Sequence, residues 1–283
     1  MAPNQYSNFS QRAWGRAVRV AATQLAFVTM ALAGPKHASS RELAVKIVAQ
    51  IRRADYEGDR AALQRLYASL EPFTADVKIA SRVHYWRGFA LWRRAINGFN
   101  ESQTPKDLES DLTQAIVEFK ESAAKDTAFV DAKVGTISCL SSLIYMSRGN
   151  SSRVQELIGQ SRPLVEAAKA ADPENPRLLW VLGPILWNVP PERGGGQDKA
   201  MEAEERGLRT AREAKGTHGD PLDPSWGEPE LLMALAWSNL NRTTPDLNAA
   251  EQDAQAALKL VPYWHYVCDI LMPQIRKAQA KAG

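Results

Sequence analysis

Residues 172–202 read DPENPRLLWVLGPILWNVPPERGGGQDKAME, and this stretch decides the fold. Asn175 and Pro176 open a helix, because asparagine is a favourable N-cap and the missing N–H of proline costs nothing at the first helical position. Leucines then recur at the three- and four-residue spacing of one helix face. A double proline at Pro190 ends this helix, a triple glycine forms a mobile turn, and a second helix begins near Lys199. The stretch therefore predicts a helix, a loop and a second helix.

The same helix-start and helix-stop signals recur along the rest of the chain. A capping box, S-x-x-E, opens the first helix, and turns rich in Gly, Pro, Asn and Asp separate the later apolar-periodic runs. No stretch alternates as a half-buried strand does, so we expect an all-α fold built from helix pairs. The expected helices span 39–56, 60–70, 76–98, 128–147, 153–171, 176–189, 197–214, 228–240 and 263–281, with two more capped at 104–107 and 244–246.

Two prolines fall inside expected helices. Pro163 and Pro184 each remove one intrahelical hydrogen bond, so we expect each to kink or break its helix. The missing N–H of Pro184 leaves the carbonyl of Trp180 without its usual donor. This kink is either a matter of geometry alone or a way to present a carbonyl oxygen to a ligand.

The helix pairs resemble tetratricopeptide repeats over about residues 40–262. The positions that match the repeat consensus are Leu182, Gly183, Ala200, Ala250, Pro173 and Pro262. Two positions depart from it: Leu186 replaces the usual tyrosine, and Glu204 replaces the usual aromatic residue. The resemblance implies a right-handed α-solenoid of about five helix pairs, closed by a C-terminal capping helix at 263–281. It also implies partner or ligand binding and does not imply catalysis.

Two shorter resemblances concern the glycine-rich turn and the loop after it. PPERGGGQDKA at 190–200 and DPSWGEPELL at 223–232 are similar to a family of exported bacterial repeat proteins. The glycine-rich loop before Lys199-Ala200 also resembles the repeat component associated with TRAP-type solute transporters. The first likeness implies export, and the second implies a small-solute binding role beside an envelope transporter.

The first 33 residues have the composition of a secretion signal. Arg12, Arg16 and Arg19 precede the apolar stretch 20–33, which is too short to span a bilayer and ends in an A-x-A cleavage site. We therefore expect a signal peptide at 1–33, a repeat domain at 34–283, and an exported bacterial protein that is periplasmic or secreted. An uncleaved anchor and an amphipathic N-terminal helix are the alternatives.

Charge narrows the choice of partner. The net charge is +3 among 35 basic and 32 acidic residues, and the three arginines of the signal account for all of this excess. A neutral body argues against nucleic acid or an anionic membrane surface as the main partner. No apolar stretch is long enough for a transmembrane domain.

The chain contains two cysteines, Cys139 and Cys268. Export would permit a disulfide bond. In a solenoid, however, each repeat touches only its neighbours, and these residues should lie about three helix pairs apart. We expect both to be unpaired, buried, small apolar residues.

The sequence contains no pattern that points to an enzyme. None of the four histidines has metal-ligand spacing to another histidine or to cysteine, and no P-loop or G-x-S-x-G motif is present, so we expect no metal and no cofactor. One loop groups His218 with Asp220, Asp223 and Glu228, either as a solvated loop or as the basis of a hydrolase. The triple glycine either crosses flexibly between helices or binds a small anion at a helix N-terminus.

A repeated aromatic pattern marks the candidate binding site. Residues 85–92 (YWRGFALW) and 180–187 (WVLGPILW) both read aromatic-x-x-Gly-x-x-Leu-Trp, a spacing that keeps the two aromatics and the glycine near one helix face. In the repeat frame this face borders the concave groove. The aromatics either pack between repeats or line a groove for a peptide or an apolar ligand. The candidate binding residues are Tyr85, Trp92, Trp180 and Trp187, with Arg193 at the edge.

These observations favour a non-catalytic scaffold that binds a protein or peptide partner in the cell envelope, or a small apolar ligand. The alternative is a small-solute binding component of an envelope transporter, and a hydrolase has the weakest support. An open, continuous groove would favour the scaffold. A closed aromatic pocket beneath the glycine-rich and DPSWG loops would favour the solute-binding protein.

Overall fold

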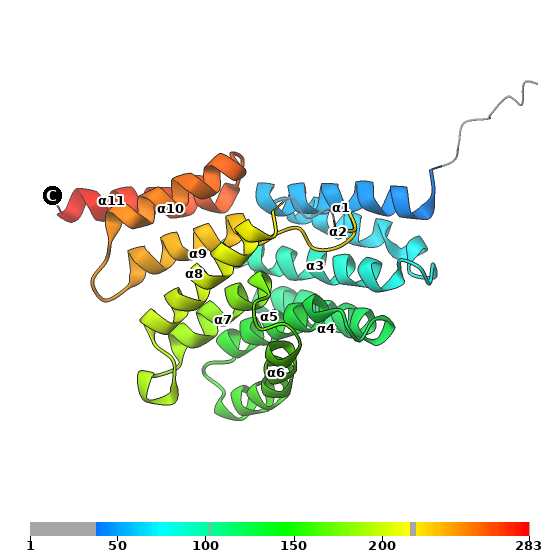
Figure 1. The fold of residues 1–283 in the computed structure, drawn as a ribbon, viewed down its shortest axis with the longest axis horizontal. Coiled ribbons are helices and arrows are strands. Elements are labelled where there is room, and N and C mark those ends of the chain that lie inside the picture. Colours follow the sequence, from blue (N-terminus) through cyan, green and yellow to red (C-terminus); the bar gives the residue numbers. More distant parts are fainter. Residues whose placement is uncertain (1–37, 102, 216–218, 283) are drawn as a thin grey trace, which may run out of the picture. The chain divides into compact units, whose positions relative to one another are not determined.

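The computed structural model describes residues 38–101, 103–215 and 219–282, and every regular element within these ranges is helical (Figure 1). The expected all-α class is confirmed for this part of the chain. The expected signal peptide at 1–33, its cleavage site and His218 lie outside the described residues.

Eleven α-helices follow one another along the described ranges. They are α1 (Ser40–Glu57), α2 (Arg60–Ser69), α3 (Ala80–Gly98), α4 (Pro105–Lys125), α5 (Val130–Met146), α6 (Ser151–Ala171), α7 (Pro176–Asn188), α8 (Gln197–Glu213), α9 (Glu228–Asn241), α10 (Leu247–Leu260) and α11 (Met272–Ala282). Short 3₁₀ turns lie at Glu71–Phe73 and Pro191–Arg193, and a π-helical segment, Tyr266–Leu271, runs directly into α11.

The helices pack in an order that follows the sequence. Each helix from α1 to α5 contacts the next, as does each helix from α7 to α10, and the alternate helices α1, α3, α5, α7 and α9 also contact one another in turn (Figure 1). The alternate helices therefore form a continuous row, with the intervening helices packed against it. This arrangement is compatible with an α-solenoid.

Local capping explains where the helices begin. The Ser39 hydroxyl accepts from the backbone N–H of Glu42 while the Glu42 carboxylate accepts from the N–H of Ser39, so the predicted capping box is present. Asn175 caps α7 as predicted, because its side-chain oxygen accepts from the N–H groups of Arg177 and Leu178. Further side-chain caps come from Asp59, Thr104, Asn150 and Asp246.

Neither internal proline breaks its helix. Pro163 lies within α6 and Pro184 within α7, and both helices continue on either side. Both prolines are exposed. Two elements differ from expectation. Helix α3 begins at Ala80 and not at residue 76, and the expected helix 263–281 contains the π-helical segment.

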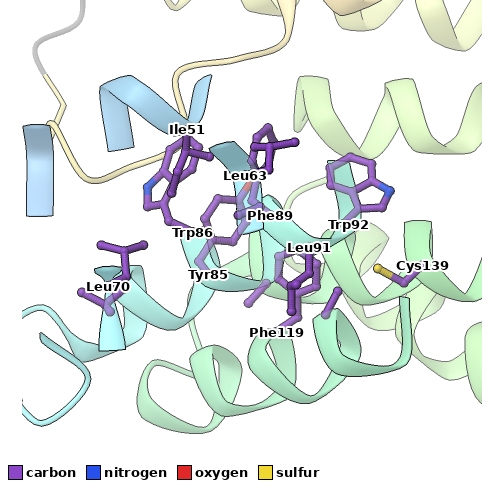
Figure 2. Close-up of a cluster of buried hydrophobic side chains, with 14 of the residues drawn as sticks. Ile51, Leu63, Leu70, Tyr85, Trp86, Phe89, Leu91, Trp92, Phe119 and Cys139 are labelled. Atoms are coloured by element: carbon purple, nitrogen blue, oxygen red, sulfur yellow. The ribbon is translucent and has the colours of Figure 1, made fainter. Parts of the chain in front are cut away.

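Close approach of the helices depends on a large side chain that faces two glycines. The Phe119 ring of α4 lies between Gly88 of α3 and Gly135 of α5, and a Cβ added at these glycines would lie 2.9 Å and 2.5 Å from ring atoms. Phe119 is fully buried in a cluster that also contains Tyr85 and Trp92 (Figure 2). The absence of two methyl groups therefore lets α3, α4 and α5 pack around one aromatic ring.

The segment 219–227, which joins α8 to α9, runs back across the first helices (Figure 1). Arg41 pairs with Asp220 at 2.6 Å, Arg82 pairs with Asp223 at 2.6 Å, and the Trp86 indole donates to the Leu222 carbonyl at 2.7 Å. These contacts join parts of the chain that are far apart in sequence. The expectation that each repeat touches only its neighbours is therefore wrong for this segment.

The end of α1 makes a second long-range contact. The Tyr56 hydroxyl donates to the Glu230 carboxylate of α9 at 2.6 Å, and the Tyr56 ring lies 5.1 Å from the Trp264 ring in an edge-to-face arrangement. The C-terminal elements therefore pack against both α10 and the first helix.

The two cysteines are unpaired, as predicted. Cys139 is buried in α5, which confirms for this residue the prediction of burial. Cys268 is half-buried, because it lies in the π-helical segment near the surface and its thiol faces the Pro262 carbonyl.

The glycine contacts predict opposite effects for two alanine substitutions. Gly135→Ala drives a methyl group into the Phe119 ring and should lower the free energy of unfolding by about 1–3 kcal/mol. Gly159→Ala, on the exposed face of α6 with no atom near the added methyl group, should raise it by about 0.5–1 kcal/mol. Urea denaturation of both variants measures the difference, and a stabilised Gly135→Ala variant would contradict the packing described here.

Candidate functional site

The structure divides the five candidate residues between core and surface. Tyr85 and Trp92 are each 1% exposed, so they belong to the core and do not line a surface (Figure 2). Trp180 and Trp187 are half-buried, and Arg193 is exposed. The Trp92 and Trp180 rings lie 5.9 Å apart, which brings the two sequence segments together as the repeated pattern suggested.

Trp226, from the segment 219–227, explains why the first aromatic pair is covered. Its ring lies 5.8 Å from the Trp92 ring and 5.6 Å from the Trp180 ring, and its indole donates to the Tyr85 hydroxyl at 2.8 Å. The loop residue therefore occupies the face on which Tyr85 and Trp92 were expected to be open. For these two residues the core-packing interpretation describes the structure.

Trp180 and Trp187 lie at a pocket of about 260 Å³. It is bordered by α3, α7, α8, α9 and the segment around the π-helical turn, and it is partly open to solvent. Its aromatic residues are Phe99, Trp180, Trp187, Trp237, Trp264 and Tyr266. Arg193 and the triple glycine are not part of its lining.

The pocket lies where a carboxylate replaces an aromatic ring. Glu204 of α8 faces Gly183 of α7, just as Phe119 of α4 faces Gly88 of α3, and a Cβ at Gly183 would lie 2.5 Å from Glu204 Oε1. The prediction that Gly183 permits close packing of the following helix is confirmed. A carboxylate is smaller than a phenyl ring, and at this position both Glu204 and Gly183 line the pocket.

Glu204 is a buried acid without a cationic partner. Glu204 is 3% exposed, and its carboxylate accepts one hydrogen bond, from the Ser238 hydroxyl at 2.9 Å. Within the described part of the chain no lysine, arginine or histidine lies within ion-pair distance of it. Burial raises the pKa of the Glu204 carboxyl from 4.5 to about 7, although the hydrogen bond from Ser238 opposes the shift.

The other charged residue of the pocket is already paired. Arg93 Nε donates to the Asp55 carboxylate at 2.7 Å, and the Asn97 amide donates to the same carboxylate at 3.3 Å. Arg93 and Asp55 are both buried, so their charges compensate each other away from water. The uncompensated charge facing the pocket is therefore that of Glu204.

Contacts behind and between the rings hold the aromatic walls in place. The Trp180 indole donates to the Glu230 carbonyl at 3.0 Å, and the Trp187 and Trp237 rings meet edge to face at 5.2 Å. Rings fixed in this way would lose little side-chain entropy when a ligand binds against them.

The loop acids that suggested a hydrolase have structural partners. Asp220 pairs with Arg41, Asp223 pairs with Arg82, and Glu228 contacts Arg212 and Lys215. In the part of the chain that the structure describes, no three His, Cys, Asp or Glu side chains gather as metal ligands would.

The triple glycine forms a defined turn. Gly194 and Gly196 have φ angles of 84° and 104°, a conformation that glycine adopts without strain. The backbone N–H groups of Gly194, Gly195 and Gly196 donate to carbonyls of Pro191, Pro190 and Leu186. These three N–H groups are thus occupied by backbone carbonyls.

Comparison with known proteins adds no relative. No protein-family model matches the chain, and no curated protein matches it. Among the helices of the described ranges, none is both long enough and apolar enough to cross a bilayer.

The residues predicted from sequence include Trp180 and Trp187 of the pocket but do not include Glu204. Glu204 was recognised as a departure from the repeat pattern, and that departure was the signal that could have located the site. Trp237, Trp264 and Tyr266 gave no such signal, because they come from different elements and share no motif with residues 180–187.

The raised pKa of Glu204 predicts how the ligand-free protein responds to pH. Folded Glu204 keeps its proton up to about pH 7 and unfolded Glu204 loses it near pH 4.5, so stability falls as pH rises between these values. The variant Glu204→Gln has no titrating carboxyl at this position, so its stability does not fall for this reason. Its stability relative to the parent should therefore increase by about 2 kcal/mol between pH 5 and pH 8.

Glu205→Gln is the matched control, because Glu205 is the neighbouring residue on the exposed face of α8. Urea denaturation at both pH values compares the three proteins. If both variants respond to pH alike, the Glu204 carboxylate is not held in the desolvated state described here.

Proposed function

We propose that this protein binds a small solute, and that the pocket around Glu204 is the binding site. The observation that carries the proposal is an aromatic pocket containing one buried acid without a cationic partner. Its volume of about 260 Å³ lies near the lower end of small-molecule sites and is too small for a peptide of several residues. The pocket is partly open, and neither the glycine-rich turn nor the DPSWG loop lines it, so it differs from the closed pocket beneath those loops that was expected of a solute-binding protein. Its small volume is what favours the solute-binding alternative.

The position of the segment 219–227 supports the same choice. It lies against α1 and α3, and Trp226 fills the space between Trp92 and Trp180 that a partner's side chain would otherwise use. We therefore place solute binding ahead of the peptide scaffold. The proposed role is non-catalytic, since the lining offers one carboxylate and neither a histidine nor a cysteine.

The proposal includes the tetratricopeptide-type architecture. Successive helices from α1 to α6 and from α7 to α11 pack as neighbours, and small residues lie opposite Phe119 and Glu204 at corresponding places in two helix pairs. These features support a solenoid of helix pairs, which we propose to be right-handed and to contain about five pairs, one of them adapted to hold a ligand.

Native mass spectrometry of the protein purified from its native host tests the function directly, together with a titration of small solutes. The panel contains amines, carboxylates, sugars and neutral alcohols, and intrinsic fluorescence reports occupancy because Trp180, Trp187, Trp237 and Trp264 line the pocket. If no small molecule is retained and no member of the panel binds, the proposal fails.

Two tryptophan truncations separate the pocket from the core. Trp92→Ala removes a buried ring and should lower the free energy of unfolding by about 3–5 kcal/mol. Trp187→Ala removes a half-buried wall of the pocket, so it should cost about 1 kcal/mol in stability while weakening solute binding by about tenfold or more. Denaturation and fluorescence titration measure the two effects, and unchanged affinity in Trp187→Ala would remove this residue from the site.

We also propose that the protein is exported. The support is the composition of residues 1–33, with its three arginines, short apolar stretch and A-x-A site. The intact mass of protein from the envelope or medium of its native host should correspond to a chain that starts at Gly34. Full-length protein confined to the cytosolic fraction would contradict export.

A further inference from the structure

The pocket combines aromatic rings with a buried acid that has no cationic partner. Six aromatic residues line it, and of its two charged residues Arg93 is neutralised by Asp55 while Glu204 has no counter-ion. A cation held among aromatic rings is attracted by their negative faces, most strongly by tryptophan and when water is excluded. A buried carboxylate adds the opposite charge that such a ligand would neutralise.

From this arrangement we infer that the pocket takes a small organic cation, an alkylammonium or quaternary ammonium compound, with Glu204 as its counter-ion. The inference rests on the proposed solute-binding function and names the class of solute. In this arrangement the cation's apolar groups contact Trp180, Trp187, Trp237 and Trp264, and the Glu204 carboxylate neutralises its charge.

Other ligand classes match the lining less well. An anion would meet the Glu204 carboxylate, and the guanidinium of Arg93 is already engaged by Asp55 at 2.7 Å. A neutral solute would gain apolar contact with the rings but would gain no attraction from the ionised carboxylate. A cation satisfies both the rings and the acid.

Protonation of Glu204 should compete with the cation. Besides burial, the groups that bear on its titration are the Ser238 hydroxyl of α9 and Glu205 on the same helix. The other titratable groups at the pocket are Arg93, which is paired with Asp55, and Tyr266; α7 contributes no charged residue to the lining. The cation requires the ionised acid. Affinity should therefore rise with pH through the range in which Glu204 loses its proton.

The test compares choline with 3,3-dimethylbutan-1-ol, a neutral molecule of nearly the same shape. Isothermal titration calorimetry is run on the full chain and on its Glu204→Gln and Glu205→Gln variants at pH 6 and pH 8. Choline should bind the parent at least about tenfold more tightly than the neutral alcohol at pH 8. Its affinity should fall about tenfold at pH 6, where Glu204 is mostly protonated.

The variants assign the effect to one carboxylate. Glu204→Gln should lose choline affinity by about tenfold or more and lose its pH dependence, with binding of the neutral alcohol little changed. Glu205→Gln, which removes the same charge from the exposed face of α8, should bind choline as the parent does. Circular dichroism confirms that each variant is folded.

The possible failures are distinguishable. If the neutral alcohol binds as tightly as choline, or if Glu204→Gln binds choline normally, the pocket remains a small-solute site and the cation inference is overturned. If neither molecule binds and anions or sugars from the wider panel do, the cation inference fails while the proposed function stands. If nothing in the panel binds, both fail together.

Discussion

The close approach of neighbouring helices is the constraint on which the rest of this structure depends. Phe119 lies against Gly88 and Gly135, so three helices converge on one ring because two of them carry no side chain at the point of contact. Close packing of this kind is sensitive to a single methyl group. It fixes the spacing of α3, α4 and α5, and through them the row of alternate helices that supports every other element.

A second close approach of two helices, in which Glu204 takes the place that Phe119 has in the first, lies at the pocket. Glu204 faces Gly183 as Phe119 faces Gly88, but the carboxylate fills less space and carries a charge. Burial of an acid beside one serine hydroxyl is unfavourable for the ligand-free protein, as its raised pKa reflects. Groups whose pKa is shifted by burial in a concave site are frequently functional, since the stability given up in the free protein returns as affinity for the correct ligand.

Long-range contacts decide which aromatic faces are open. The segment 219–227 inserts Trp226 between the two aromatic segments, and the Tyr56–Glu230 hydrogen bond ties α1 to α9. Local sequence around Gly219 and Gly227 indicates only a loop rich in turn residues. Its ion pairs with Arg41 and Arg82 show that it is part of the packed structure, and its presence converts an expected groove into a covered core beside a separate pocket.

The sequence by itself determined the helices, because capping residues, turn residues and apolar periodicity act over a few positions and need no distant partner. It also marked Gly183 as a point of close packing and Glu204 as a departure from the repeat pattern. The two segments YWRGFALW and WVLGPILW are nearly the same locally, yet Trp92 is buried and Trp187 lines a pocket. Helical period fixes which face a side chain occupies, whereas what covers that face comes from elements far along the chain, so only the tertiary structure could separate core from site.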